Sequence, residues 1–321
     1  MKAFNLFIKK YNIYLLLACI ILLQTVCLTV SFANNKKGYH SDELWSYGFA
    51  CSSEGMNVFS ERDGQTPKNF DKWVSSSVLH DYITIDKSET FDYVSVYQNS
   101  ADDYHPFLYF ILLHFICSIF PGTFSMWYAY VINIIFFIIQ QIFLFKLIRS
   151  LTGNSHWGII GTFFFGLTTG SENILFFLRM YCPATALSVV LFYYLTELYN
   201  KRNDSKISKS LFIKLFITTL AGCLLLHEFI ILAFIAALLY GLYYLFTKHV
   251  KYASIFGGTM ISSALLSIGI FPSTIPHLFG STGTFGGHVK KYSFMFQFKI
   301  YWSYITNELF GIATSPWHTM T

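Results

Sequence analysis

The chain has 321 residues, of which 54% are hydrophobic and only 12% are charged. A soluble globular protein carries about 25% charged residues, so this composition excludes an ordinary soluble domain and predicts an all-α polytopic membrane protein. The net charge of +5 does not indicate a nucleic-acid partner, because the basic residues cluster where cytoplasmic loops are expected. We expect a single transmembrane domain over residues 1–321.

The first expected element is an apolar run over residues 11–32, which follows a short basic segment. This run is too long for the core of a signal peptide, and no clear small-residue cleavage site follows it. We therefore predict an uncleaved first span whose amino end is cytoplasmic. Residues 33–126 then form a large extracytoplasmic loop, which holds most of the acidic residues.

Within that loop, residues 107–120 are apolar but cover only about 21 Å as a helix, less than the ~30 Å of a bilayer core. If they spanned the membrane, Lys146 and Arg149 would face outside and every later basic cluster would be inverted. We therefore predict an interfacial helix here. The positive-inside rule then supports spans that alternate in direction, which we expect at residues 127–148, 157–178, 180–199, 211–226, 229–246 and 252–271, with a less clean eighth at 292–313.

Two further features limit the choices. The six cysteines include no CxxC pair, and all but Cys51 lie in apolar runs, so neither a zinc site nor a disulfide framework is predicted. The chain ends without a basic or polar tail, which is what we expect of a truncated member of a longer fold. A multi-pass protein of the plasma membrane is the resulting expectation.

This topology gathers ionisable residues of three kinds on the extracytoplasmic face. A carboxylate there can act as a general base on an acceptor hydroxyl or amine, and an Arg or His can hold a phosphate. Such a set suits a transferase that uses a lipid-phosphate donor. The candidate residues are Asp42, Glu43, Asp103, His105, Arg179, His227 and Glu228.

The order of these motifs resembles that of the GT-C glycosyltransferases, in particular the protein O-mannosyltransferase and aminoarabinose-transferase-like branch. The resemblance covers Asp-Glu at 42–43, Asp-x-His-Pro at 103–106 and Arg-x-Tyr at 179–181. It implies a GT-C-like helical bundle and transfer of a sugar from a polyprenyl-phosphate donor, with inversion. In this resemblance Asp42 is the catalytic carboxylate, Glu43 helps to seat the acceptor, and Arg179 lies at the phosphate end of the donor.

The sequence departs from the family pattern at two points. Phe107 stands where the motif has a second proline, and no acidic residue follows Arg179 closely. Simpler interpretations also exist: Asp42-Glu43 as a loop pair or the start of a helix capped by Ser41, Arg179 as an interface residue, and His227-Glu228 as a self-contained pair.

The sequence leaves alternatives open for metal binding and for function. The carboxylates of residues 42, 43, 102 and 103 could supply oxygen ligands to Mg²⁺ or Mn²⁺, but we expect no metal and no other cofactor. The partners we expect are the polyprenyl-phosphate donor, membrane lipid and an extracytoplasmic acceptor. The alternatives are a transporter or lipid flippase, which would place ionisable groups near the bilayer midplane, and a non-catalytic membrane component of an envelope-assembly complex.

Overall fold

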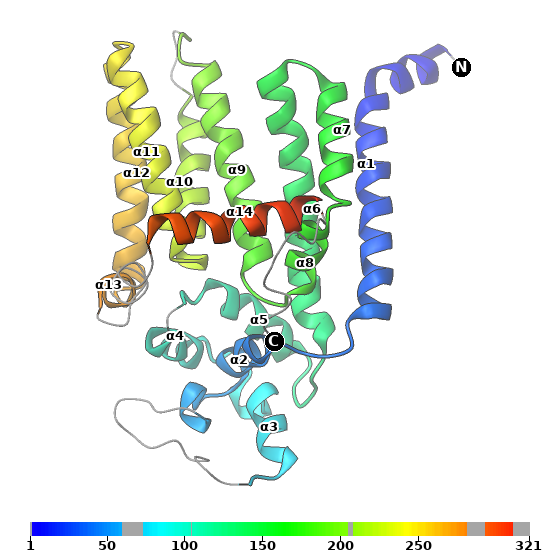
Figure 1. Cartoon of the computed structure of the whole chain (residues 1–321), viewed down its shortest axis with the longest axis vertical. Helices are drawn as coiled ribbons and strands as arrows, with labels where there is room; N and C mark the ends of the chain where they lie inside the picture. Colours follow the sequence, from blue (N-terminus) through cyan, green and yellow to red (C-terminus); the bar gives the residue numbers. More distant parts are fainter. Residues whose placement is uncertain (1, 60–72, 104, 205–207, 281–292, 311–321) are drawn as a thin grey trace.

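The computed structural model describes residues 2–59, 73–103, 105–204, 208–280 and 293–310. Every regular element in this part of the chain is a helix. Figure 1 shows a bundle of long, roughly parallel helices above a layer of short helices. The bundle consists of α1 (Lys2–Asn35), α6 (Met126–Thr152), α7 (Ser155–Phe165), α9 (Tyr181–Asn200), α10 (Lys209–Leu225), α11 (Glu228–Phe246) and α12 (Val250–Ile270).

Four of the described helices are long and apolar enough to cross a membrane, and their outward faces carry large exposed hydrophobic side chains. This supports the predicted class of helical membrane protein. α9, with 20 residues, and α10, with 17, run beside them; the count of seven spans stays a prediction. The four segments are Asn12–Asn35, Met126–Thr152, Glu228–Phe246 and Val250–Ile270.

The layer of short helices comes from the polar loop after α1. Its helix α5 (Leu108–Ile119) is apolar but has only 12 residues, and it packs against α2 rather than running along the bundle. The largest hydrophobic cluster joins this layer to the ends of α1, α6 and α9. The other elements of the layer are α2 (Ser41–Cys51), η1 (Gly55–Val58), α3 (Ser76–Ile83), η2 (Lys87–Glu89) and α4 (Tyr93–Asp102).

The expected single span at 157–178 is wrong: the segment forms two helices, α7 and α8 (Thr169–Phe176). The break has a local cause, since the side chain of Thr168 caps α8 by accepting a hydrogen bond from the Ser171 amide. Two carbonyls at the end of α7, those of Thr162 and Phe163, accept hydrogen bonds from Gln24 Nε2 at 3.2 and 2.9 Å. A side chain at Gly166 would overlap Gln24, so glycine is required where the two segments meet.

The expected eighth span at 292–313 lies partly outside the described residues. Its described part forms α14 (Phe294–Phe310), which Figure 1 shows crossing the long helices rather than running beside them. α14 contacts α8. It is not among the four helices that meet the length and hydropathy of a span.

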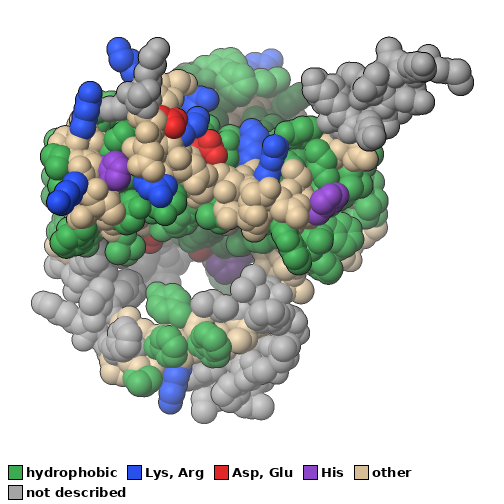
Figure 2. All heavy atoms as spheres, turned by 90° about the horizontal axis from the view of Figure 1, so that it is seen from above, with side chains coloured by type: hydrophobic (Ala, Val, Ile, Leu, Met, Phe, Trp, Pro, Cys, Tyr) green, Lys and Arg blue, Asp and Glu red, His purple; other side chains and the backbone are tan. Residues whose placement is uncertain are grey.

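The two ends of the bundle differ in charge. Lys146, Lys201 and Lys251 lie near one end, which we call the basic end; Figure 2 looks onto this end and shows Lys and Arg side chains spread over it. The layer of α2 to α5 covers the opposite end, which we call the layer end, and α13 (Thr274–Phe279) also lies there. The two ends therefore match the asymmetry expected of a membrane protein.

Candidate functional site

Four of the predicted residues meet at the layer end. Arg179 Nη1 donates a hydrogen bond to Asp42 Oδ2 at 2.5 Å, and Arg179 Nη2 lies 3.4 Å from His105 Nε2. His105 Nδ1 in turn lies 2.8 Å from Asp103 Oδ2. A continuous chain of polar contacts thus joins Asp42, Arg179, His105 and Asp103, although 137 residues separate Asp42 from Arg179.

The directions of these hydrogen bonds define the tautomer of His105. A guanidinium group can only donate, so His105 Nε2 must accept from Arg179. Nδ1 then carries the proton and donates to Asp103. His105 therefore links the cation of Arg179 to the second carboxylate, and the two contacts fix the orientation of the imidazole ring.

The first turn of α2 places Asp42. His40 is the N-cap, and its Nδ1 accepts a hydrogen bond from the Asp42 amide at 3.2 Å. The acidic pair thus does begin a helix, but with His40 rather than Ser41 as the cap. The positive end of the helix favours the two carboxylates there. The Asp42 side chain remains 40% exposed, whereas that of Arg179 is 6% exposed, so the carboxylate is the accessible partner of this ion pair.

Glu43 occupies a different environment from its neighbour. Its side chain is fully buried, and Lys36 Nζ lies 2.7 and 2.8 Å from its two oxygens. Oε2 also accepts from the His40 amide at 2.8 Å, and Oε1 from the Leu178 amide at 2.9 Å. These four contacts make Glu43 a positioning residue that ties the start of α2 to the residue before Arg179.

Arg179 lies in the short non-helical stretch between α8 and α9. Asn133, which is fully buried in α6, donates from Nδ2 to the carbonyls of Leu175 and Phe177, at 3.0 Å in each case. Together with the Glu43 contact to Leu178, these bonds fix the backbone immediately before Arg179. Sequence reasoning missed Asn133 and Lys36. A polar residue inside the apolar run 127–148 was the available signal for Asn133.

Arg179 is only 5% exposed, and its Nε has no hydrogen-bond partner among the described residues. The guanidinium carbon lies 5.8 Å from the ring centre of Tyr181, which stacks on Phe177 with centroids 5.6 Å apart. A buried donor without an acceptor is costly. It is also the kind of group that a bound anion would satisfy.

Asp103 and His105 are positioned from α4. Asn99 Nδ2 donates to the carbonyls of Phe49 and Ser52, at 3.1 and 2.7 Å, which fastens α4 to the end of α2. The Asp103 amide then donates to the Asn99 carbonyl. Tyr104 lies outside the described residues. Phe107, which stands in place of the second proline, is the N-cap of α5 and makes no side-chain capping bond.

His227 lies beside this network without a hydrogen bond to it. It is 2% exposed, and its Nε2 lies 3.2 Å from Nδ1 of His277, whose Nε2 donates to the Ala101 carbonyl. Burial, followed by the neighbouring His277 and His105, lowers the pKa of His227 to about 3. Its hydrogen-bond partner is thus His277 rather than Glu228, which is exposed and close enough to Tyr181 to act on it electrostatically.

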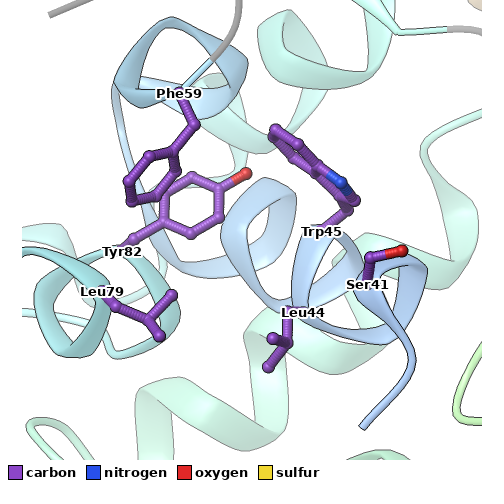
Figure 3. Close-up of a pocket in the computed structure, with 6 residues that line it drawn as sticks. All are labelled: Ser41, Leu44, Trp45, Phe59, Leu79 and Tyr82. Carbon is purple, nitrogen blue, oxygen red and sulfur yellow. The ribbon is translucent and has the colours of Figure 1, made fainter. Parts of the chain in front are cut away.

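An apolar pocket opens on the same helix as Asp42. It has a volume of about 210 Å³, and Figure 3 shows Trp45 and Tyr82 presenting their rings to it, with Leu44 below. Ser41, the residue before Asp42, is part of its wall. One wall residue of the pocket is therefore the sequence neighbour of the accessible carboxylate.

Over the part of the chain that the structure describes, no three His, Cys, Asp or Glu side chains form a group that could hold a metal ion. That the protein needs no metal ion stays a prediction. Comparisons with models of protein families, with curated proteins and with solved structures gave no match for this chain. The likeness to the GT-C glycosyltransferases therefore depends on the order of the sequence motifs alone.

Proposed function

We propose that the chain is a membrane glycosyltransferase of the GT-C type, which transfers one sugar from a polyprenyl-phosphate donor to an extracytoplasmic acceptor. One observation carries the proposal: the network of Asp42, Arg179, His105 and Asp103 at the layer end. It combines an accessible carboxylate with a buried cation that has an unused donor. A loop pair or an interface arginine would not require these residues to meet.

In the proposed reaction, Asp42 takes the proton from the acceptor hydroxyl as its oxygen attacks the anomeric carbon. The new carbon–oxygen bond forms while the bond from the anomeric carbon to the phosphate oxygen breaks, and the electron pair leaves on the polyprenyl phosphate. Attack from the opposite side inverts the anomeric centre. Arg179 stabilises the phosphate charge, and the adjoining rings of Trp45 and Tyr82 provide apolar surface for a sugar or acceptor.

The direct test is transfer of radiolabelled sugar from a polyprenyl-phosphate donor by the purified protein. Asp42→Asn keeps the size of the side chain but removes the base, so transfer should fall at least ~100-fold while membrane insertion is unchanged. Asp81→Asn is the matched control, because Asp81 lies in the same layer with its side chain 79% exposed. Full activity of Asp42→Asn would disprove the role of Asp42.

The shared face can be tested separately by labelling single cysteines in a background that lacks the natural ones. Cysteine at position 42 should react with an impermeant reagent added outside the cell. Cysteine at position 202, which lies at the basic end, should react only after the membrane is opened. Labelling of both positions from one side would remove the argument for an extracytoplasmic site.

A second candidate function, transport of a small polar solute, is favoured by the break between α7 and α8. Gln141 is fully buried near the middle of α6, and neither polar atom of its side chain has a partner among the described residues. Gln24 Oε1 and Thr162 Oγ1 are also buried without a hydrogen-bond partner among the described residues. Polar groups beside a broken helix are typical of transporter sites. Gln141→Leu should abolish solute uptake if this candidate is right, and leave sugar transfer intact if it is wrong.

A further inference from the structure

A second pocket lies at the basic end, the opposite end of the bundle from Asp42. It has a volume of about 180 Å³ and is built on three helices that pass side by side. α9 forms its floor, because α9 contacts both α6 and α10, which form its walls. The lining residues are Phe143, Lys146, Tyr193, Tyr194, Glu197, Lys201, Ser208, Ser210, Leu211 and Lys214.

The charge of this pocket is unbalanced. Three lysines face a single carboxylate, that of Glu197. Lys201 Nζ lies 3.9 Å from Glu197 Oε2, so it takes up that negative charge, and Glu197 Oε1 also accepts from Ser150. Lys146 and Lys214 take part in none of the ion pairs between described residues. Two positive charges in a concave site attract an anion.

Other features of the pocket favour an anion as well. α10 begins at its rim, where the N-cap Ser208 makes no side-chain capping bond and the positive end of the helix favours a negative charge. Lys146 Nζ sits 4.6 Å from the ring centre of Phe143, which directs the ammonium group over the pocket wall. The hydroxyl-bearing residues Ser210 and Tyr194 complete the polar lining.

The depth of the pocket indicates which anion it suits. Lys146 lies six residues before the end of α6 and Lys214 five after the start of α10, which places their Cα atoms about 9 and 7.5 Å inside the helix ends. Lysine side chains rooted at this depth extend towards the lipid headgroups. We propose that this pocket binds a phosphate group, either on the headgroup of an anionic phospholipid or as a free phosphate ester. The proposal does not depend on the function proposed for the layer end.

The test is native mass spectrometry of the full chain in detergent, titrated with phosphatidylglycerol, with phosphatidylcholine and with inorganic phosphate. Wild-type protein should bind phosphatidylglycerol in preference to phosphatidylcholine. Lys146→Gln/Lys214→Gln should weaken that binding about tenfold or more, at about 1 kcal/mol per lysine. Lys248→Gln/Lys251→Gln is the matched control, because it removes the same charge from exposed positions at the same end, and it should keep the affinity.

The two sources of phosphate are separated in the same experiment. Displacement of the lipid by millimolar inorganic phosphate supports a site for free phosphate, and retention of the lipid supports a headgroup site. Equal binding of the two lipids by wild-type protein, or equal weakening by both double variants, would overturn the proposal. Lys146→Gln/Lys214→Arg keeps the charge at position 214, so it should bind phosphatidylglycerol more tightly than Lys146→Gln/Lys214→Gln. Melting temperatures identify any variant that is merely unstable.

Discussion

The carboxylate of Glu43 accepts a hydrogen bond from the amide of Leu178 at 2.9 Å. The two residues adjoin Asp42 and Arg179, so this single bond sets the distance between the accessible carboxylate and the buried guanidinium. The neighbouring acidic residues of the motif thus divide the work. Glu43 is buried and positions the backbone around the site, whereas the side chain of Asp42 is accessible to solvent.

We expect Glu43→Gln to lower the stability of the protein as well as its activity. An amide nitrogen would face Lys36 or the His40 amide, both of which donate, and the Lys36 charge would lose its partner. Breaking a buried ion pair costs about 3–5 kcal/mol, which thermal unfolding in detergent should show as a large fall in melting temperature. Combining Glu43→Gln with Lys36→Met should cost less than the sum of the two changes. Strict additivity would contradict the contact.

Gln24→Leu should destabilise the bundle by about 1–2 kcal/mol. The substitution removes a donor to the carbonyls of Thr162 and Phe163. The Thr162 carbonyl also accepts from the Gly166 amide, so the Phe163 carbonyl is the one that loses its donor in an apolar environment. The measurement is unfolding by denaturing detergent, followed by circular dichroism. Leu22→Ile is the control: Leu22 lies on the same helix and is 65% exposed, so this change should leave stability unchanged. If Gln24→Leu behaves like this control, the bond to the broken helix is unimportant.

Gly48→Ala should destabilise the layer of short helices. A methyl group at this position would overlap the ring of Tyr82, which is 3% exposed and forms part of the apolar pocket. Overpacking of this kind costs about 1–3 kcal/mol, visible in the melting temperature. Gly257→Ala is the control: the position is also within a helix, but a methyl group there meets nothing within 4 Å, so the change should be neutral or slightly stabilising. Equal behaviour of the two variants would contradict the predicted clash.

Acid should destabilise the protein through His227. Its pKa in the folded protein, about 3, is below the ordinary value of 6.5, so the unfolded chain binds more protons between these values. Stability is therefore fully present above pH 6.5 and falls towards pH 3, by at most about 1.4 kcal/mol per pH unit for one proton. His277 contributes in the same direction, because burial lowers its pKa too.

His227→Gln should flatten the dependence of melting temperature on pH between 4 and 7. His80→Gln removes a histidine whose side chain is 57% exposed and should preserve the wild-type slope. An unchanged slope in His227→Gln would show that other groups cause the acid sensitivity.

Hydropathy and charge were enough to predict the class of protein, the four apolar helices and the short helix at 108–119, because these signals are local in the chain. The predicted topology placed Asp42, Arg179, His105 and Asp103 at one membrane face, and polar contacts join these four residues in the structure. The break within residues 157–178 was not predicted, because the run reads as continuous. The cap at Thr168 is local, whereas the close approach of Gln24 to Gly166 involves a side chain from another helix.

The different roles of Asp42 and Glu43 could not be read from the sequence either. The two carboxylates are adjacent and alike, and what separates them is the contact of Glu43 with a residue 135 positions later. The same applies to His227, whose partner His277 is 50 residues away. Neither pairing leaves a periodic or local signal.

The long interval between Asp42 and Arg179 has a consequence for biosynthesis. A ribosome releases the chain from its amino end, so the acidic pair is synthesised before the arginine. Until residue 179 arrives, 137 positions later, Asp42 has no guanidinium beside it and Glu43 has only part of its set of donors. The network is therefore a late product of assembly, and a nascent chain halted within α8 would lack the contact between Asp42 and Arg179.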